Sequence, residues 1–276
     1  MKFSFMCINL TICPHISQYS IEKLLEYGRP HAAITCLERM LHSKSAIDPQ
    51  QCVRALLGAL KSSEPNHAMD SYHMVELIKH LHSDSAVSDE DLFRVEWAYL
   101  PLLNQLDGNK PVYLHRKLAN EPDFFCEVIQ LIYRSNKEGD KTEEPSEEQK
   151  AIATNAYRLI SEWSRPPGQM DDESFDAEHF RNWIEKVKVS CAESGHLEPA
   201  LIHIGEVLLY APQDEDGLWI HRAAADALNS RDSEKMRRGF HSASFSSRGV
   251  HWVDPTAKPE KELAERYRKK QRMSRM

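Results

Sequence analysis

Over residues 176–211 the chain reads DAEHFRNWIEKVKVSCAESGHLEPALIHIGEVLLYA. Apolar residues recur at helical spacing on both sides of Gly195, and glycine is the residue type that most often ends a helix. The stretch therefore predicts two helices, from Asp176 to Ser194 and from Leu197 to Ala211, joined at Gly195. This helix hairpin is the basic unit of the fold that the rest of the sequence predicts.

The same start and stop signals recur from Ser20 onward. Gly28 ends one predicted helix, and Pro30 suits the first turn of the next. Ser88 begins a segment with the spacing of a capping box, with Asp in place of the preferred Glu or Gln. Pro101 should end or kink the helix that Ser88 opens, because proline lacks the amide hydrogen that a helix interior requires.

Composition favours helices over strands. The chain has 276 residues, 41% of them hydrophobic, which suffices for one elongated or two compact domains. It has only 10 glycines, which disfavours the many tight turns of an all-β fold. We therefore predict an all-α fold of antiparallel helix hairpins, stacked in a partly solenoid-like array of the tetratricopeptide or HEAT kind.

One polar stretch suggests a boundary between domains. Residues 135–149 read SNKEGDKTEEPSEEQ and contain no hydrophobic residue, as in a solvated acidic loop. The predicted organisation is an irregular extension (1–19), an N-terminal helical domain (20–137), an acidic linker (138–149), a helical-hairpin domain (150–230) and a basic C-terminal segment (231–276).

One spacing, glycine-x4-alanine-x3-aliphatic, occurs twice along the chain. Its copies are Gly28-x4-Ala33-x3-Leu37 and Gly195-x4-Ala200-x3-Ile204. The glycine turns the chain, the alanine allows close helix approach, and the larger residue fills the groove. This spacing resembles the second helix of a tetratricopeptide repeat, and the resemblance implies degenerate helix-hairpin stacking.

Several short motifs carry a second resemblance. They are Gly28-Arg29-Pro30-x-Ala32-Ala33, Glu96-Trp97-Ala98-Tyr99-Leu100-Pro101-Leu102-Leu103, Asp123-Phe124-Phe125, Arg238-Gly239-Phe240, Arg248-Gly249-Val250 and Glu265-Arg266-Tyr267-Arg268. Together they are similar to a helical region near the C-termini of large bacterial proteins of uncharacterised function. The resemblance implies that the chain is part of a larger protein, and it brings no activity or site residues.

Charge is distributed unevenly. Residues 231–276 contain 13 Lys/Arg and 6 Asp/Glu, a net charge of +7, while the whole chain is at −7, so residues 1–230 hold −14. The basic segment could contact nucleic acid, an acidic partner surface or a membrane face, or it could lie on the chain's own acidic surface. Candidate contact residues are Arg237, Arg238, Phe240, Arg248, Trp252, Lys269 and Lys270.

No catalytic motif or phosphate-binding loop is present in the sequence, and we predict no cofactor and no metal site. His73, Glu76 and His80 lie at helical spacing and could face one metal ion, but an exposed polar face explains them equally well. Glu96 lies in an apolar helix, where we expect it to pair with Arg94 or Arg116 rather than to act as an acid or base.

The 6 cysteines are scattered, with no C-x-x-C pair, which predicts free thiols and a cytoplasmic location. The stretch Met1–Cys13 has the outline of a secretory signal but no A-x-A cleavage pattern follows it. No apolar run reaches the length of a membrane span, so we expect no membrane contact.

The sequence therefore predicts a non-enzymatic helical protein-interaction module, part of a larger bacterial protein or complex, with a protein partner. The first alternative is nucleic-acid binding through residues 231–276. The second alternative is an enzyme with an unrecognised site.

Overall fold

The computed structural model describes residues 18–63, 69–103, 109–137, 144–172, 174–213 and 220–246. Within these ranges the chain forms twelve α-helices and two short 3-10 helices, and its only β-type pairing is an isolated antiparallel bridge between Gln169 and Phe175. The predicted all-α fold is confirmed. Of the predicted N-terminal extension, residues 1–17 lie outside the described ranges.

The chain divides into two units, Met1–Leu103 (unit 1) and Asn104–Met276 (unit 2). This differs from the predicted division at residues 138–149. The acidic segment joins two helices, α7 and α8, that pack on each other within unit 2. The acidic segment therefore connects two helices of one unit rather than two units, because a connecting segment can lack hydrophobic residues while the flanking helices share a core.

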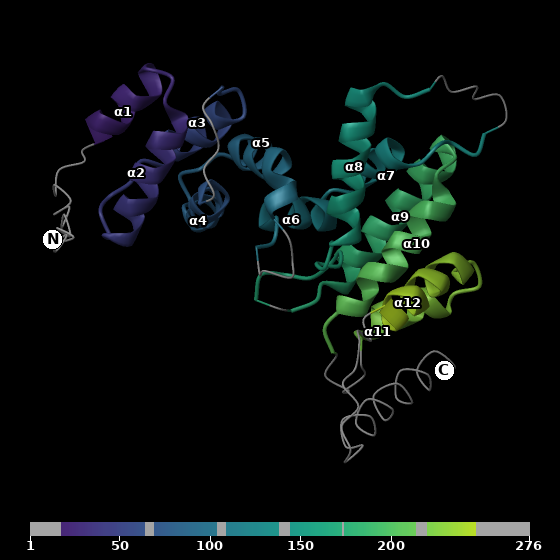
Figure 1. Cartoon of the computed structure of the whole chain (residues 1–276). Helices are drawn as coiled ribbons and strands as arrows, with labels where there is room; N and C mark the ends of the chain where they lie inside the picture. Colours follow the sequence, from purple (N-terminus) through teal and green to yellow (C-terminus); the bar gives the residue numbers. More distant parts are fainter. Residues whose placement is uncertain are drawn as a thin grey trace, which may run out of the picture. The chain divides into compact units, whose positions relative to one another are not determined.

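Five α-helices build unit 1: α1 (Gln18–Glu26), α2 (Pro30–His42), α3 (Pro49–Ala59), α4 (Asp70–Ser83) and α5 (Asp89–Tyr99), followed by the 3-10 helix η1 (Leu100–Leu102). Each of the first three packs on the next helix and on the next but one (Figure 1). Apolar residues of every helix fill the core between them, among them Ile21, Leu37, Leu56, Leu77 and Val95.

The helix ends in unit 1 follow the signals in the sequence. Gly28 follows α1 with a φ of +66°, a conformation that favours glycine. The carboxylate of Asp48 accepts a hydrogen bond from the Gln50 amide at 3.0 Å and caps α3. The Ser88 hydroxyl accepts one from the Asp91 amide at 3.2 Å and caps α5. Helix α5 ends before Pro101, as expected.

Seven α-helices build the described part of unit 2: α6 (Val112–Asn120), α7 (Pro122–Ile132), α8 (Glu147–Ser161), α9 (Ala177–Ser194), α10 (Leu197–Val207), α11 (Arg222–Asn229) and α12 (Glu234–Ser246), with the 3-10 helix η2 (Leu208–Tyr210) after α10. Helix α7 packs on α6, α8, α9 and α10. Its sequence is strongly apolar, and its neighbours bury it from several sides.

Three aromatic side chains form the centre of unit 2. The ring centroid of Phe125 on α7 lies 5.0 Å from that of Trp183 on α9 and 5.5 Å from that of Trp163, which follows α8. All three are buried. The indole nitrogen of Trp163 donates a hydrogen bond to the His115 carbonyl at 3.3 Å, which satisfies its polar atom inside the core.

The predicted hairpin of α9 and α10 is confirmed. Gly195 joins the two helices with a φ of +79°. A Cβ at this position would lie 2.5 Å from the Ser135 hydroxyl, because the chain after α7 lies against the turn. The Asn136 amide donates to the Gly195 carbonyl at 3.0 Å. Glycine is therefore required here both for its conformation and for its small size.

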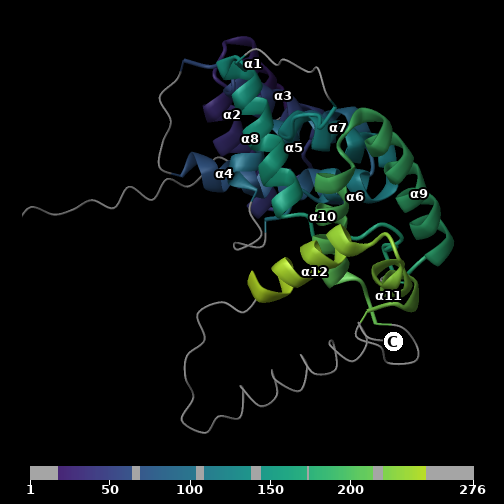
Figure 2. The same cartoon turned by 90° about the vertical axis from the view of Figure 1, so that its right-hand side faces the viewer.

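The basic segment begins with an ordered helix rather than a loop. Helix α12 continues to Ser246 and packs on α10, and the two helices cross in both views (Figures 1 and 2). Met236 and Gly239 are buried in this contact. On α12 the buried residues include Met236, Gly239 and Ser244, while Arg238 and His241 are exposed.

Candidate functional site

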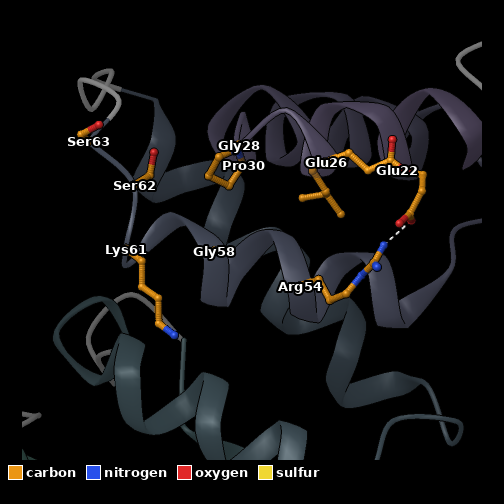
Figure 3. A pocket seen from close by; sticks show the side chains of 10 residues that line it. Glu22, Glu26, Gly28, Pro30, Arg54, Gly58, Lys61, Ser62 and Ser63 are labelled. Carbon is orange, nitrogen blue, oxygen red and sulfur yellow. Dashed lines mark hydrogen bonds and ion pairs between the residues drawn. The ribbon is translucent and has the colours of Figure 1, made fainter.

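A pocket of about 520 Å³ lies in unit 1, where α1, the start of α2 and the end of α3 meet (Figure 3). It is lined by Glu22, Leu25, Glu26, Gly28, Pro30, Arg54, Gly58, Lys61, Ser62 and Ser63. The sequence predicts none of these as site residues. They come from three separate helices and the turns beside them, so no spacing in the chain could reveal them.

The shape of the pocket depends on small and rigid residues. Gly28 allows the tight turn from α1 into α2, and Pro30 occupies the first turn of α2. A Cβ on Gly58 would lie 3.4 Å from the Pro30 side chain, so the two walls approach closely at this point. Arg29 is the N-cap residue of α2, so the positive end of the helix dipole lies beside the pocket.

The two carboxylates of the pocket already have basic partners. Arg54 forms an ion pair with Glu22, and this contact holds the pKa of the Glu22 carboxyl below its usual value. Lys23 pairs with Glu26 at 2.8 Å. In the described part of unit 1, by contrast, no carboxylate pairs with Lys61. The pocket therefore holds one basic side chain that is available for an outside anion.

The charges are separated along the pocket. Figure 3 shows Glu22 and Arg54 facing each other at one end, with Lys61, Ser62 and Ser63 at the other. Two exposed apolar side chains neighbour the lining in sequence: Tyr27, which is 76% exposed, precedes Gly28, and Leu60, which is 50% exposed, precedes Lys61. A segment that contacts these two side chains as well as the pocket would meet apolar surface and Lys61, which has no carboxylate partner among the described residues of unit 1.

A second pocket, of about 480 Å³, lies in unit 2 between the end of α7 and the start of α8. Tyr133 contributes to its wall, and its hydroxyl lies 2.8 Å from His203 Nε2. His203 Nδ1 in turn lies 2.7 Å from a Glu206 carboxylate oxygen. Burial raises the pKa of Tyr133, with further contributions from Tyr157 and Glu206. A protonated phenol makes this chain of hydrogen bonds a structural tie between α7 and α10 rather than an activated nucleophile.

The histidines of α4 lie against neighbouring helices, which differs from the exposed polar face that the sequence suggests. His73 Nδ1 lies 3.4 Å from Glu38 on α2. Asp70, at the start of α4, lies 3.2 Å from His31 on α2. Glu76 instead pairs with Lys79 on its own helix. These contacts hold α4 on α2 and do not converge on one point. Among the described residues, no group of three or more His, Cys, Asp or Glu could hold a metal ion.

Glu96 has a partner that the sequence did not indicate. Its carboxylate is fully buried and lies 2.6 Å from His82 Nε2, across the interface of α4 and α5. The two arginines expected to pair with it are elsewhere: Arg94 lies beside Asp91, and Arg116 lies over the Tyr113 ring. The expected ion pair is therefore replaced by a histidine–carboxylate contact.

Three of the seven candidate contact residues of the basic segment lie on α12, within the part of the chain that the structure describes. The Arg237 guanidinium donates to the carbonyls of Leu228 and Ser230, at 2.9 and 3.1 Å, and so holds the end of α11. Arg238 is exposed and lowers the pKa of Glu198, after the larger effect of Lys235. Phe240 is half-buried beside His241. The other four, Arg248, Trp252, Lys269 and Lys270, lie outside the described residues.

Of the helices that the structure describes, none has the length and apolar character needed to cross a membrane. Comparisons with protein-family models, with curated proteins and with solved structures find no match to this chain.

Proposed function

We propose that this protein is an interaction module that binds an acidic peptide segment of a partner protein in the pocket of unit 1. The observation that carries the proposal is Lys61, which lines the open pocket without a carboxylate partner among the described residues of unit 1, while Glu22 and Glu26 are both paired. A carboxylate entering the pocket meets Lys61 and the positive end of the α2 dipole.

The order of packing in unit 1 supports this function. Helices α1 to α3 each pack on the next helix and the next but one. This is the order that stacked helix hairpins produce, and such stacks expose extended surfaces for peptides and partner domains. The tetratricopeptide-like spacing of Gly28, Ala33 and Leu37 belongs to this same region.

Two exposed apolar side chains add a second kind of contact. Tyr27 and Leu60 are large, exposed and next to lining residues. Apolar anchors of the partner segment would bury these side chains, while its acidic residue reaches Lys61. The partner belongs to a larger bacterial assembly in this proposal, as the resemblance to regions of large bacterial proteins implies, and the scattered cysteines favour binding in the cytoplasm.

Selection from a random phage-displayed peptide library on the purified full chain tests this function. We expect an enriched consensus with Asp or Glu beside apolar residues. Lys61→Glu should weaken binding of the selected peptides by about 10-fold or more, because it replaces attraction with repulsion. Lys188→Glu is the matched control, since Lys188 lies on α9 in unit 2 and pairs with Glu185. Peptides that lack acidic residues, or that bind the Lys61→Glu variant equally well, would contradict the proposal.

The charge asymmetry of the chain favours a second candidate function, nucleic-acid binding through residues 231–276. This function requires affinity for DNA or RNA oligonucleotides that falls steeply with salt concentration. It also requires that a 1–246 truncation lose that affinity, because only 4 of the 13 Lys/Arg of the segment precede residue 247. Equal binding by both chains would exclude it.

A further inference from the structure

Two cysteines from different helices meet inside unit 2. Cys126 on α7 and Cys191 on α9 are 2% and 0% exposed, and their sulfur atoms lie 3.4 Å apart. Both are free thiols. The sequence places them 65 positions apart and indicates no relation between them.

The two thiols are not equivalent. The Cys191 S–H donates to the Cys126 sulfur, and a hydrogen bond from Ser190 adds to it; together they lower the pKa of Cys126. The pKa of Cys191 is raised, first because its hydrogen goes to Cys126 and second because it is buried. Cys126 is therefore the sulfur of the pair that loses its proton more readily, and a thiolate is the form that reacts with oxidants.

We propose that Cys126 and Cys191 form an oxidation site, which hydroperoxides convert into an intramolecular disulfide that links α7 to α9. In the first step the Cys126 thiolate attacks the terminal peroxide oxygen. An S–O bond forms and the O–O bond breaks. The leaving alkoxide or hydroxide takes up the proton that the Cys126 thiol has released and departs as an alcohol or water, so that Cys126 becomes a sulfenic acid. In the second step the Cys191 sulfur, having lost its proton, attacks the Cys126 sulfur. The S–S bond forms, and hydroxide leaves as water with that proton.

The geometry requires a small movement only. A disulfide needs a sulfur–sulfur distance of about 2.05 Å, so the two sulfur atoms, which lie 3.4 Å apart, must move closer to each other. The pair lies at the same α7–α9 interface as Phe125 and Trp183. Because both sulfurs are buried, peroxide reaches them only when this interface opens locally, so oxidation is slow and the product is shielded from reductants.

This inference does not depend on peptide binding in unit 1, and peptide mapping tests it without any substitution. The full chain is treated with hydrogen peroxide, unfolded in N-ethylmaleimide and digested, and the peptides are identified by mass spectrometry. We expect a cross-linked peptide pair containing Cys126 and Cys191. Cys52 is the matched control, because it is fully buried but its thiol has a pKa raised to about 12 and no cysteine beside it among the described residues. It should remain available for alkylation.

Two further measurements separate the roles of the sulfurs. The sulfenic-acid reagent dimedone should label Cys126 in the Cys191→Ser variant and leave Cys191 unlabelled in the Cys126→Ser variant. Oxidised wild-type protein should unfold about 5–10 °C higher than reduced protein, and dithiothreitol should reverse the change. Alkylation of Cys126 and Cys191 to the same extent as Cys52 after peroxide treatment, or a cross-link to a different cysteine, would overturn the inference.

Discussion

Gly205 of α10 and Gly239 of α12 lie at one crossing of the two helices, and each leaves room for the backbone of the other helix. A Cβ on Gly205 would lie 1.9 Å from the Met236 carbonyl oxygen, and a Cβ on Gly239 would lie 1.9 Å from that of Ile202. No side chain, not even alanine, fits at either position without separating the helices. The start of the basic segment is thus held to unit 2 by two glycines.

Gly205→Ala and Gly239→Ala should each destabilise unit 2 by about 3 kcal/mol, because the added methyl group meets backbone that cannot move aside. Urea unfolding measures this loss. Gly58→Ala is the control, since its methyl group would meet Pro30 at an ordinary 3.4 Å. That variant should be neutral or slightly stabilising, as alanine favours a helix over glycine. Equal stability of all three variants would contradict the close crossing.

His82→Ala should destabilise unit 1 by about 2–4 kcal/mol, because it removes the imidazole that lies 2.6 Å from a fully buried carboxylate. Chemical denaturation gives the free energy of unfolding. Lys79→Ala is the control, because it removes the partner of Glu76 from an exposed ion pair on the same helix. This variant should change the free energy of unfolding by about 0.5 kcal/mol at most. If Lys79→Ala lowers the free energy of unfolding as much as His82→Ala does, the contact between His82 and Glu96 does not stabilise unit 1 more than an exposed ion pair.

Acid should destabilise unit 2 partly through His115. Burial, with a smaller effect of Lys110, lowers the pKa of its imidazole to about 3. In the unfolded chain the imidazole takes up a proton near pH 6.5. Its contribution to stability is therefore complete above about pH 6.5 and is lost as pH falls toward 3.

His115→Gln keeps a polar side chain and cannot be protonated. Between pH 7.5 and pH 5 its free energy of unfolding should fall by about 2 kcal/mol less than that of the wild type. Urea titrations of both proteins at the two pH values measure the difference. Parallel losses would mean that other groups cause the acid sensitivity.

Tyr99 should be one of the last tyrosines to ionise. Burial raises its pKa to about 12, and its hydroxyl donates to the Leu56 carbonyl at 2.7 Å. The stability that it contributes is present below about pH 10 and is lost as pH rises toward 12, because the unfolded chain releases the proton first. Tyr99→Phe should cost about 1 kcal/mol at neutral pH. In a spectrophotometric titration the variant should lack one late-ionising tyrosine.

Local signals predicted the helices well because helix ends depend on a few adjacent residues. Asp48 caps α3, Ser88 caps α5, and Gly28 and Gly195 adopt positive φ where the sequence places a turn. Each of these residues acts within one helical turn, so the local sequence alone is sufficient to predict the helix end. The division into units was not predictable in this way, since it depends on which apolar faces meet.

The candidate sites illustrate the same limit. The spacing of His73, Glu76 and His80 shows that they share one side of a helix, but not that Glu38 lies opposite His73. Likewise, nothing near Glu96 in the sequence indicates His82 as its partner. Spacing shows on which side of its own helix a side chain lies. The residue that it contacts depends on which other helix packs against that side.

By itself the sequence determined the all-α class, most helix ends and the uneven charge of this protein. The tertiary structure alone decided the division at residue 103, the pocket around Lys61, the crossing at Gly205 and the meeting of Cys126 with Cys191. The physical reason is the separation in sequence over which each effect acts. Capping and turn preferences act between neighbours along the chain, while burial joins residues far apart in sequence, and many pairings satisfy the same apolar pattern until the helices pack together.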